Sequence, residues 1–199
     1  RFIFFYLILF LLVIIFWINF PIISLFIFLL MTIVHFGLCD WAFFRIKNNK
    51  FIITLTYGMT VIFGIIFFNE QESFKIFEYL TNKNIYFFQK FLIYPYIITI
   101  VLVLYFMYLS FYNTNLRKGI IEICLLLTIF YFFDPLLSFA IYFCFVHTYK
   151  HLNHLIKMIF THLENKKFVI YTTILFTIIS WIAGLYIIYF LSINFSIYE

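Results

Sequence analysis

The sequence predicts an all-α fold, a polytopic integral membrane bundle of about seven transmembrane helices. Of the 199 residues, 66% are hydrophobic and only 11% are charged, and the mean hydropathy is +1.11. Soluble domains contain about 25% charged residues, so this composition is typical of a chain that lies mostly within a lipid bilayer. The apolar residues also form runs of about 20, the length that a helix needs to cross the hydrocarbon core.

Polar clusters and prolines separate these runs and set the expected elements in order. Proline marks two of the turns because it begins helices readily and interrupts them elsewhere. Turns are predicted at Asn19–Pro21, Arg45–Lys50, Asn113–Lys118, Asp134–Pro135 and Thr161–Lys167. The spans are approximately residues 2–18, 21–44, 51–68, 91–112, 119–133, 135–156 and 168–191. They leave no soluble region, so we expect residues 1–199 to form a single transmembrane domain.

The longest connection, Asn69–Lys90, is amphiphilic, unlike the spans on either side. Its central segment Lys75–Leu80 has the sequence KIFEYL, in which charged and apolar side chains are mixed. Such a segment favours a short helix that lies along the membrane interface.

Lysine and arginine residues fall unevenly on the two sides that alternating spans create. One side collects ten of them and the other only three, so the positive-inside rule makes the first side cytoplasmic. We therefore expect an integral protein of the cell (inner) membrane with cytoplasmic basic loops. The net charge of +5 then reflects topology and does not indicate nucleic-acid binding. The ten are Arg1, Arg45, Lys47, Lys50, Arg117, Lys118, Lys150, Lys157, Lys166 and Lys167, and the three are Lys75, Lys83 and Lys90.

Histidines inside two apolar runs are the candidate functional residues. His147 and His151 are four residues apart, so on a helix they share one face, with Cβ atoms about 5–6 Å apart. Two imidazoles placed in this way can turn onto one metal ion. His35 lies in the second span. Ionisable side chains at membrane depth are costly to bury and are functional candidates by default.

The expected topology places these three histidines at a similar depth. The second and sixth spans both run toward the cytoplasm. His35 follows the start of its span by about 14 residues, and His147 and His151 follow the start of theirs by about 12 and 16. At a rise of about 1.5 Å per residue, all three imidazoles fall in the cytoplasmic half. We therefore predict a metal site where the two helices meet.

Two carboxylates and a thiol are the other polar groups to consider near this site. Asp40 lies five residues after His35, about 140° around the helix, so it is expected to face away from the metal. We interpret it as a partner for a neighbouring helix end or for the outer nitrogen of an imidazole. Glu122, at comparable depth, is either a similar orienting group or a solvated interfacial residue. Cys39 shares the face of His35, and we interpret it as a small packing residue, with a soft metal ligand as the alternative.

The remaining features of interest have simpler interpretations. Gly37, two residues after His35, indicates a close contact with another helix. His154 and His162 lie near the end of the sixth span and in the loop after it, so we interpret them as interfacial, solvated residues.

The residues alone leave three classes of function open. The first is an oxygenase: imidazole suits iron, zinc, copper and nickel, and a shell of neutral histidines leaves an iron ion with open positions for dioxygen. A haem ligated by one histidine from each helix would instead make a non-catalytic, electron-transfer protein. Histidines satisfied by backbone carbonyl and hydroxyl groups, without metal, would fit a carrier or an assembly protein. A di-iron desaturase is disfavoured because its sites use several histidine clusters, and this chain has five histidines in total.

Two segments resemble a known family. The sequences PIISLFIFLLMTIVHFGLCDW and FAIYFCFVHTYKHL resemble the HFGxxD and HxxxH motifs of the Brp/Blh family of membrane β-carotene 15,15′-dioxygenases. The stretch SWIAG, Ser180–Gly184, is similar to a late helix of that family. The resemblance covers most of the chain, and the two histidine motifs together are fairly specific.

The resemblance implies an enzyme with a non-haem Fe²⁺ cofactor that cleaves the central double bond of β-carotene with O₂. The products would be two molecules of all-trans-retinal, available to an opsin. His35, His147 and His151 match iron ligands of the family, and Asp40 matches the aspartate of the first motif. The fourth ligand belongs to an HGxxD-type motif on a preceding helix, which this chain does not contain. We therefore expect a fragment of a longer protein, truncated at both ends.

Overall fold

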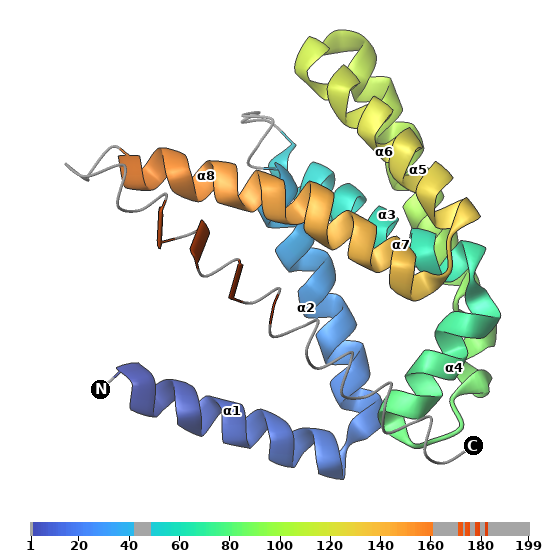
Figure 1. The fold of residues 1–199 in the computed structure, drawn as a ribbon. Coiled ribbons are helices and arrows are strands. Elements are labelled where there is room, and N and C mark those ends of the chain that lie inside the picture. The colour runs from blue at the N-terminus through green and yellow to red at the C-terminus, as the bar shows by residue number, and fades with distance from the viewer. Residues whose placement is uncertain are drawn as a thin grey trace. The chain divides into compact units, whose positions relative to one another are not determined.

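The protein is helical throughout the part of the chain that the computed structural model describes (Figure 1). That part comprises residues 2–41 and 49–160, with positions 171–172, 174–175, 178–179 and 182, and it contains no β-strand. The predicted all-α class is therefore confirmed. The chain divides into two compact units, residues 1–154 and 155–199, and the first unit contains His35, His147 and His151.

The helices follow one another with short connections. They are α1 (Phe2–Asn19), α2 (Pro21–Trp41), α3 (Lys50–Phe68), α4 (Glu70–Thr81), the 3₁₀ helix η2 (Tyr86–Phe91), α5 (Ile93–Tyr112), α6 (Thr114–Phe132), α7 (Pro135–Ile141), the π-helix η3 (Tyr142–His147) and α8 (Thr148–Phe160). Most boundaries lie within a few residues of the predicted ones. The expected span 168–191 and loop Thr161–Lys167 lie outside the fully described residues.

The chemistry of single residues explains where several helices begin and end. Pro21 and Pro135 each occupy the first position of a helix, where the missing proline N–H costs nothing. Asp134 caps α7, since one of its carboxylate oxygens accepts bonds from the backbone N–H groups of Leu136 and Leu137, both at 3.0 Å. The predicted turn at Asn113–Lys118 is too long: Asn113 alone separates α5 from α6, because Thr114 and the residues after it are already helical.

Three helical segments in the described part are long and apolar enough to cross a membrane. They are Pro21–Asp40, Lys50–Phe68 and Tyr86–Tyr112, while α1 forms a shorter apolar helix. The amphiphilic connection forms α4, which contains the predicted segment Lys75–Leu80. Phe74 of α4 is buried with Leu25 and Ile85, so one face of this helix packs against the bundle.

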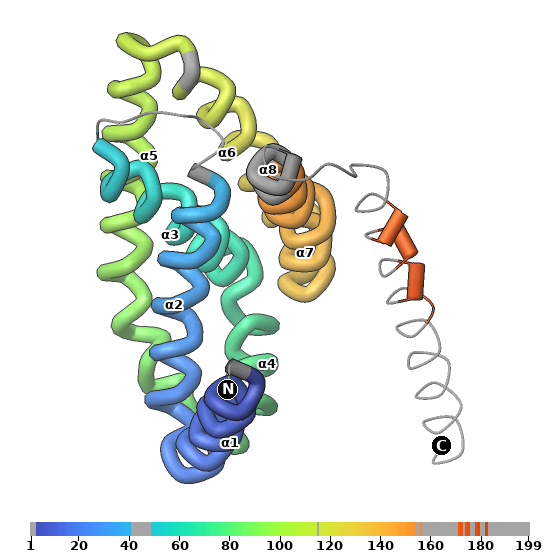
Figure 2. The backbone as a smooth tube through the Cα atoms, turned by 90° about the vertical axis from the view of Figure 1, so that its left-hand side faces the viewer, coloured from blue at the N-terminus to red at the C-terminus, as the bar shows by residue number. Residues whose placement is uncertain are grey.

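The centre of the bundle is α3, against which α2, α5 and α6 pack (Figure 2). In the apolar stretch of α3, 67% of the residues are buried, compared with 28% in α2 and 17% in the η2–α5 segment. Its buried side includes small and hydroxyl-bearing residues, which allow neighbouring helices to approach closely. They include Thr54, Thr56, Gly58, Thr60 and Gly64.

Glycines bring α2 and α3 together. A Cβ atom on Gly37 would lie 2.0 Å from the backbone oxygen of Thr54, and one on Gly58 would lie 1.8 Å from the backbone oxygen of Ile33. Each helix therefore presents a glycine to the other's backbone, and the close contact predicted from Gly37 is confirmed. This crossing also determines where His35 lies, because His35 is two residues before Gly37 in α2.

Candidate metal centre

The two apolar helices predicted to carry the site meet at their histidines. His35 of α2 and His147, the last residue of η3, have ring centroids 5.3 Å apart. Phe36 fills the space beside them, with its ring centroid 4.7 Å from that of His147. His147 is buried, with 4% of its surface exposed, whereas His35 is exposed. The site is therefore anchored in the bundle on one side and open on the other.

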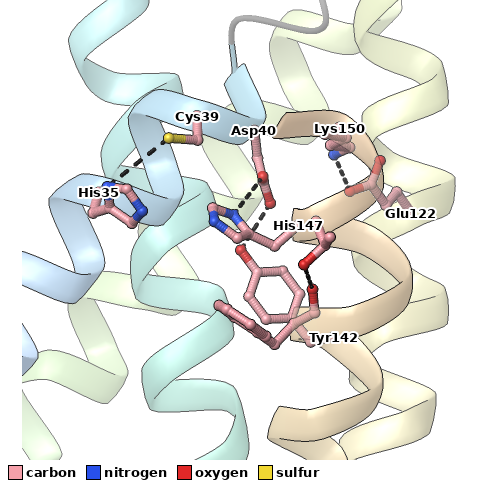
Figure 3. A network of polar contacts seen from close by, with 9 residues as sticks. His35, Cys39, Asp40, Glu122, Tyr142, His147 and Lys150 are labelled. Atoms are coloured by element: carbon pink, nitrogen blue, oxygen red, sulfur yellow. Dashed lines mark hydrogen bonds and ion pairs between the residues drawn. The ribbon is translucent and has the colours of Figure 1, made fainter. Parts of the chain in front are cut away.

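A π-helix presents His147. In η3 the backbone hydrogen bonds run to the fifth residue, so residues five apart share a face, which they do not in an α-helix. Tyr142 and His147 are five apart, and both reach Asp40 of α2 (Figure 3). Sequence reasoning missed Tyr142 because the spacing of an ordinary α-helix turns it away from His147.

Asp40 holds His147 and Tyr142 in a buried hydrogen-bond network. Its Oδ1 lies 3.2 Å from Nδ1 of His147, and its Oδ2 accepts a 2.8 Å hydrogen bond from the Tyr142 hydroxyl. Asp40 and Tyr142 have no exposed surface. Because a carboxylate oxygen only accepts, Nδ1 of His147 donates, and Nε2 keeps the lone pair that a metal needs. The contact expected between Asp40 and an imidazole is thus present.

Cys39 completes a cluster of three ligand-bearing side chains. One ring nitrogen from each of His35 and His147 and the sulfur of Cys39 all lie within 4.8 Å of one another. The sulfur lies 3.9 Å from Nδ1 of His35 (Figure 3). In the part of the chain that the structure describes, this is the group of His, Cys, Asp or Glu side chains arranged to hold a metal ion.

His151 lies one turn beyond His147, in α8. The two rings are nearly parallel, at 7°, with centroids 6.0 Å apart, so both side chains leave the helix on one face as the spacing predicts. His151 is exposed and is not within the 4.8 Å cluster. Its role as a ligand remains a prediction. The side chain of His154 and all of His162 lie outside the described residues.

An ion pair borders the site. Glu122 of α6 forms an ion pair with Lys150 of α8 (Figure 3), and the ammonium group also lies 5.1 Å from the centre of the Tyr57 ring. Lys150, whose charge was counted on the cytoplasmic side, is only 5% exposed. Burial of a lysine requires an opposite charge nearby, and Glu122 provides it. The pair ties α6 to the turn between His147 and His151.

An apolar cavity lies about one helical turn from His35 along α2. It has a volume of about 200 Å³ and extends between α2, α3, α4 and α7, with Thr32 and Phe139 among its lining residues. Thr32 is three residues before His35. Phe139 stacks on Phe143, with centroids 5.9 Å apart, and Phe143 stacks on His147 at 5.5 Å. Two stacked aromatic rings thus lie between the cavity and His147.

These residues fit a transition-metal site. The donors are two imidazoles, with a third one turn away, and a thiol, all types that bind borderline or soft divalent ions. Asp40 supplies the carboxylate partner that metal-ligating histidines usually have on their second nitrogen. No carboxylate oxygen belongs to the cluster itself, so among the described residues the site does not have the 2-His-1-carboxylate pattern.

Comparison with known proteins adds the family. A curated β-carotene 15,15′-dioxygenase from an uncultured marine bacterium, 66A03, is 29% identical over 184 residues, which cover 88% of this chain. The chain spans 63% of the length of that relative. No solved structure matches the chain. A family model described as β-carotene 15,15′-dioxygenase matches residues 1–199, and the chain therefore belongs to this family.

Proposed function

We propose that the protein acts as an iron-dependent oxygenase that cleaves the central double bond of β-carotene to give two molecules of all-trans-retinal. The observation that carries the proposal is the meeting of His35 and His147. Their ring centroids are 5.3 Å apart, and Asp40 accepts a hydrogen bond from Nδ1 of His147. The family described above and its curated relative support the choice of substrate. One O₂ supplies one oxygen atom to each aldehyde, so the reaction is balanced without a further reductant.

His35, His147 and His151 are the proposed iron ligands. Iron held there would supply the oxygen chemistry of the reaction, because a shell of neutral imidazoles leaves positions open for O₂. The protein's own residues orient and shield the site. Asp40 fixes the ring of His147 through Nδ1, and Tyr142 fixes Asp40. We propose that Glu122 acts indirectly: its ion pair with Lys150 fixes the helical turn that carries His151.

The surroundings of the cluster suit a substrate without polar groups. His35 is exposed on an apolar helix, between exposed Val34 and exposed Leu38. A hydrocarbon dissolved in the bilayer can approach such a surface without crossing water. The cavity of about 200 Å³ that Thr32 and Phe139 line is surrounded mainly by Phe, Ile and Leu and suits part of a polyene. We propose that the central bond lies over the histidines while one arm occupies this cavity.

We further propose that the protein lies in the cell (inner) membrane, with its basic loops in the cytoplasm, and that an opsin receives the retinal. The apolar helices α2, α3 and α5 support membrane insertion, and the excess of Lys and Arg on one side of the spans supports the orientation.

Expression in a β-carotene-producing bacterial strain tests the proposed reaction. The chain, and a version with a family-length N-terminal extension, would be produced and the extracted pigments separated by chromatography. We expect loss of β-carotene with accumulation of retinal. Unchanged β-carotene, with both proteins confirmed in the membrane, would contradict the proposal. A Soret absorption band in the purified protein would then favour the electron-transfer alternative.

The histidine assignment has its own test. His35→Ala, His147→Ala and His151→Ala should each abolish both iron content and cleavage, because each removes a ligand. His154→Ala is the control and should leave iron content intact, since we assign no ligand role to that residue. Iron is measured by elemental analysis of the purified protein. Loss of iron in the His154 variant, with retention in the His151 variant, would overturn the assignment.

A further inference from the structure

The sulfur of Cys39 lies where a metal ligand would lie. Cys39 follows His35 by one helical turn on α2, and its Sγ is 3.9 Å from Nδ1 of His35. A nitrogen and a sulfur bound to one zinc-like ion lie about 2.0–2.1 Å and about 2.3 Å from it, so they are at most about 4.4 Å apart. The observed separation is within that limit. His35 and Cys39 can therefore reach one ion without any movement of the helix.

His147 provides the third donor from a different helix. The three ligand atoms are all within 4.8 Å of one another. Rotation of one imidazole that shortens the longest of these separations by under about 1 Å therefore allows all three atoms to bind one ion. His147 cannot turn freely, because Asp40 holds its Nδ1. The adjustment falls on His35, which is exposed and, among the described residues, has its side-chain polar contact with Cys39. The less constrained side chain is thus the one that must move.

We propose that Cys39 is a metal ligand of this centre, so that the shell contains a thiolate as well as imidazoles. The metal site belongs to the proposed function, on which this inference rests, although binding does not require carotene cleavage. When the metal binds, the S–H bond breaks, the proton leaves to the medium and an S–metal bond forms. A nitrogen–sulfur shell takes Co²⁺ and Zn²⁺ as well as Fe²⁺.

The other two cysteines of the chain serve as a comparison for Cys39. Cys124 of α6 and Cys144 of η3 are both exposed and neither belongs to the cluster. Cys39 is half-buried, and its sulfur contacts an imidazole nitrogen. The expectation that Cys39 is only a small packing residue accounts for its size but not for this contact.

Cobalt substitution tests the ligand directly. The full chain would be purified in detergent with the substitutions Cys124→Ser and Cys144→Ser, and Co²⁺ would be titrated in while absorption is recorded. We expect a near-ultraviolet thiolate-to-cobalt charge-transfer band that saturates at one ion per chain. Cys39→Ser should remove this band. It should also weaken Co²⁺ binding by at least about 10–100-fold, because loss of a ligand costs more than loss of a hydrogen-bond partner of a ligand, which costs about that much.

A second measurement leaves Cys39 unchanged and so does not depend on the folding of a Cys39 variant. Alkylation of Cys39 by a membrane-permeable maleimide should slow when Co²⁺ or Zn²⁺ is bound, because the sulfur is then coordinated. The protection should disappear in His147→Ala. Equal alkylation rates with and without bound metal, together with no charge-transfer band, would overturn the inference.

The outcomes separate this inference from the proposed function. Cleavage of β-carotene by a protein whose bound Co²⁺ shows no sulfur band would remove Cys39 from the shell and leave the oxygenase proposal standing. A sulfur band in a protein that leaves β-carotene intact would support the ligand and contradict the oxygenase proposal. Failure to bind any stoichiometric metal would overturn the inference.

Discussion

At the scale of single residues, the site depends on one buried carboxylate. Asp40 has no exposed surface and accepts hydrogen bonds from His147 and Tyr142. The sequence indicated part of this role, because the spacing from His35 turns Asp40 away from a metal and leaves a neighbouring helix end or an imidazole as its expected partner. It did not indicate Tyr142, which reaches Asp40 only because η3 is a π-helix. Spacing rules assume α-helical geometry, and they fail where that geometry changes.

Asp40→Asn should weaken metal binding by about 10–100-fold, the usual cost of losing a partner of a ligating histidine. The amide keeps the size of the side chain but removes the negative charge that favours a donating Nδ1 on His147. Tyr142→Phe removes one hydrogen bond to the same carboxylate and should have a smaller effect, since such a bond contributes about 0.5–1.5 kcal/mol. Co²⁺ titration of the purified variants measures both. Equal affinities in Asp40→Asn and the unsubstituted protein would rule out the positioning role.

At the scale of elements, the crossing of α2 and α3 brings the functional face of α2 into place. The close approach rests on Gly37 and Gly58, each of which faces backbone atoms of the other helix. Sequence identified Gly37 as a contact residue but could not name its partner. An apolar membrane helix is hydrophobic on all sides, so its composition does not show which face is buried or against which neighbour.

Gly58→Ala should destabilise the protein by about 1–3 kcal/mol, the usual cost of an extra methyl group in a packed core. The new Cβ would lie 1.8 Å from the backbone oxygen of Ile33, and a backbone atom cannot move aside without moving the helix. Gly64→Ala in the same helix is the matched control, because its Cβ would meet the ring of Phe130 at 3.1 Å and a side chain can adjust. Thermal unfolding in detergent compares the two. The same loss of stability in both variants would contradict the role of the crossing.

At the scale of the whole molecule, the proposed orientation in the membrane rests on the distribution of charge. The apolar span of η2 and α5 separates Lys83, on the side with few basic residues, from Lys118, on the side with many. Both lysines are exposed. The positive-inside rule therefore assigns Lys118 to the cytoplasm and Lys83 to the opposite side.

Labelling of introduced cysteines in intact cells checks this orientation, with Cys39 retained in every protein. In a background with Cys124→Ser and Cys144→Ser, Lys83→Cys should react with a membrane-impermeant maleimide added outside. Lys118→Cys should react only after the membrane is permeabilised, because the proposed topology places this residue on the cytoplasmic side. Cells that carry the background substitutions alone give the blank. The reverse pattern of labelling would invert the proposed topology.

Some features of this protein were determined by the sequence itself. The all-α class, the helix starts at Pro21 and Pro135 and the convergence of His35 with His147 depend on hydrophobic run length, proline chemistry and helical rise. These are local rules, or rules set by bilayer thickness, and they act along the chain.

The tertiary structure decided the rest. It placed α3 at the centre, paired Lys150 with Glu122, brought Tyr142 to Asp40 and set the sulfur of Cys39 beside the two histidines. Each of these depends on which faces of several uniformly apolar helices meet. That choice is made by packing between helices, because no single helix carries enough polar asymmetry to determine its own orientation.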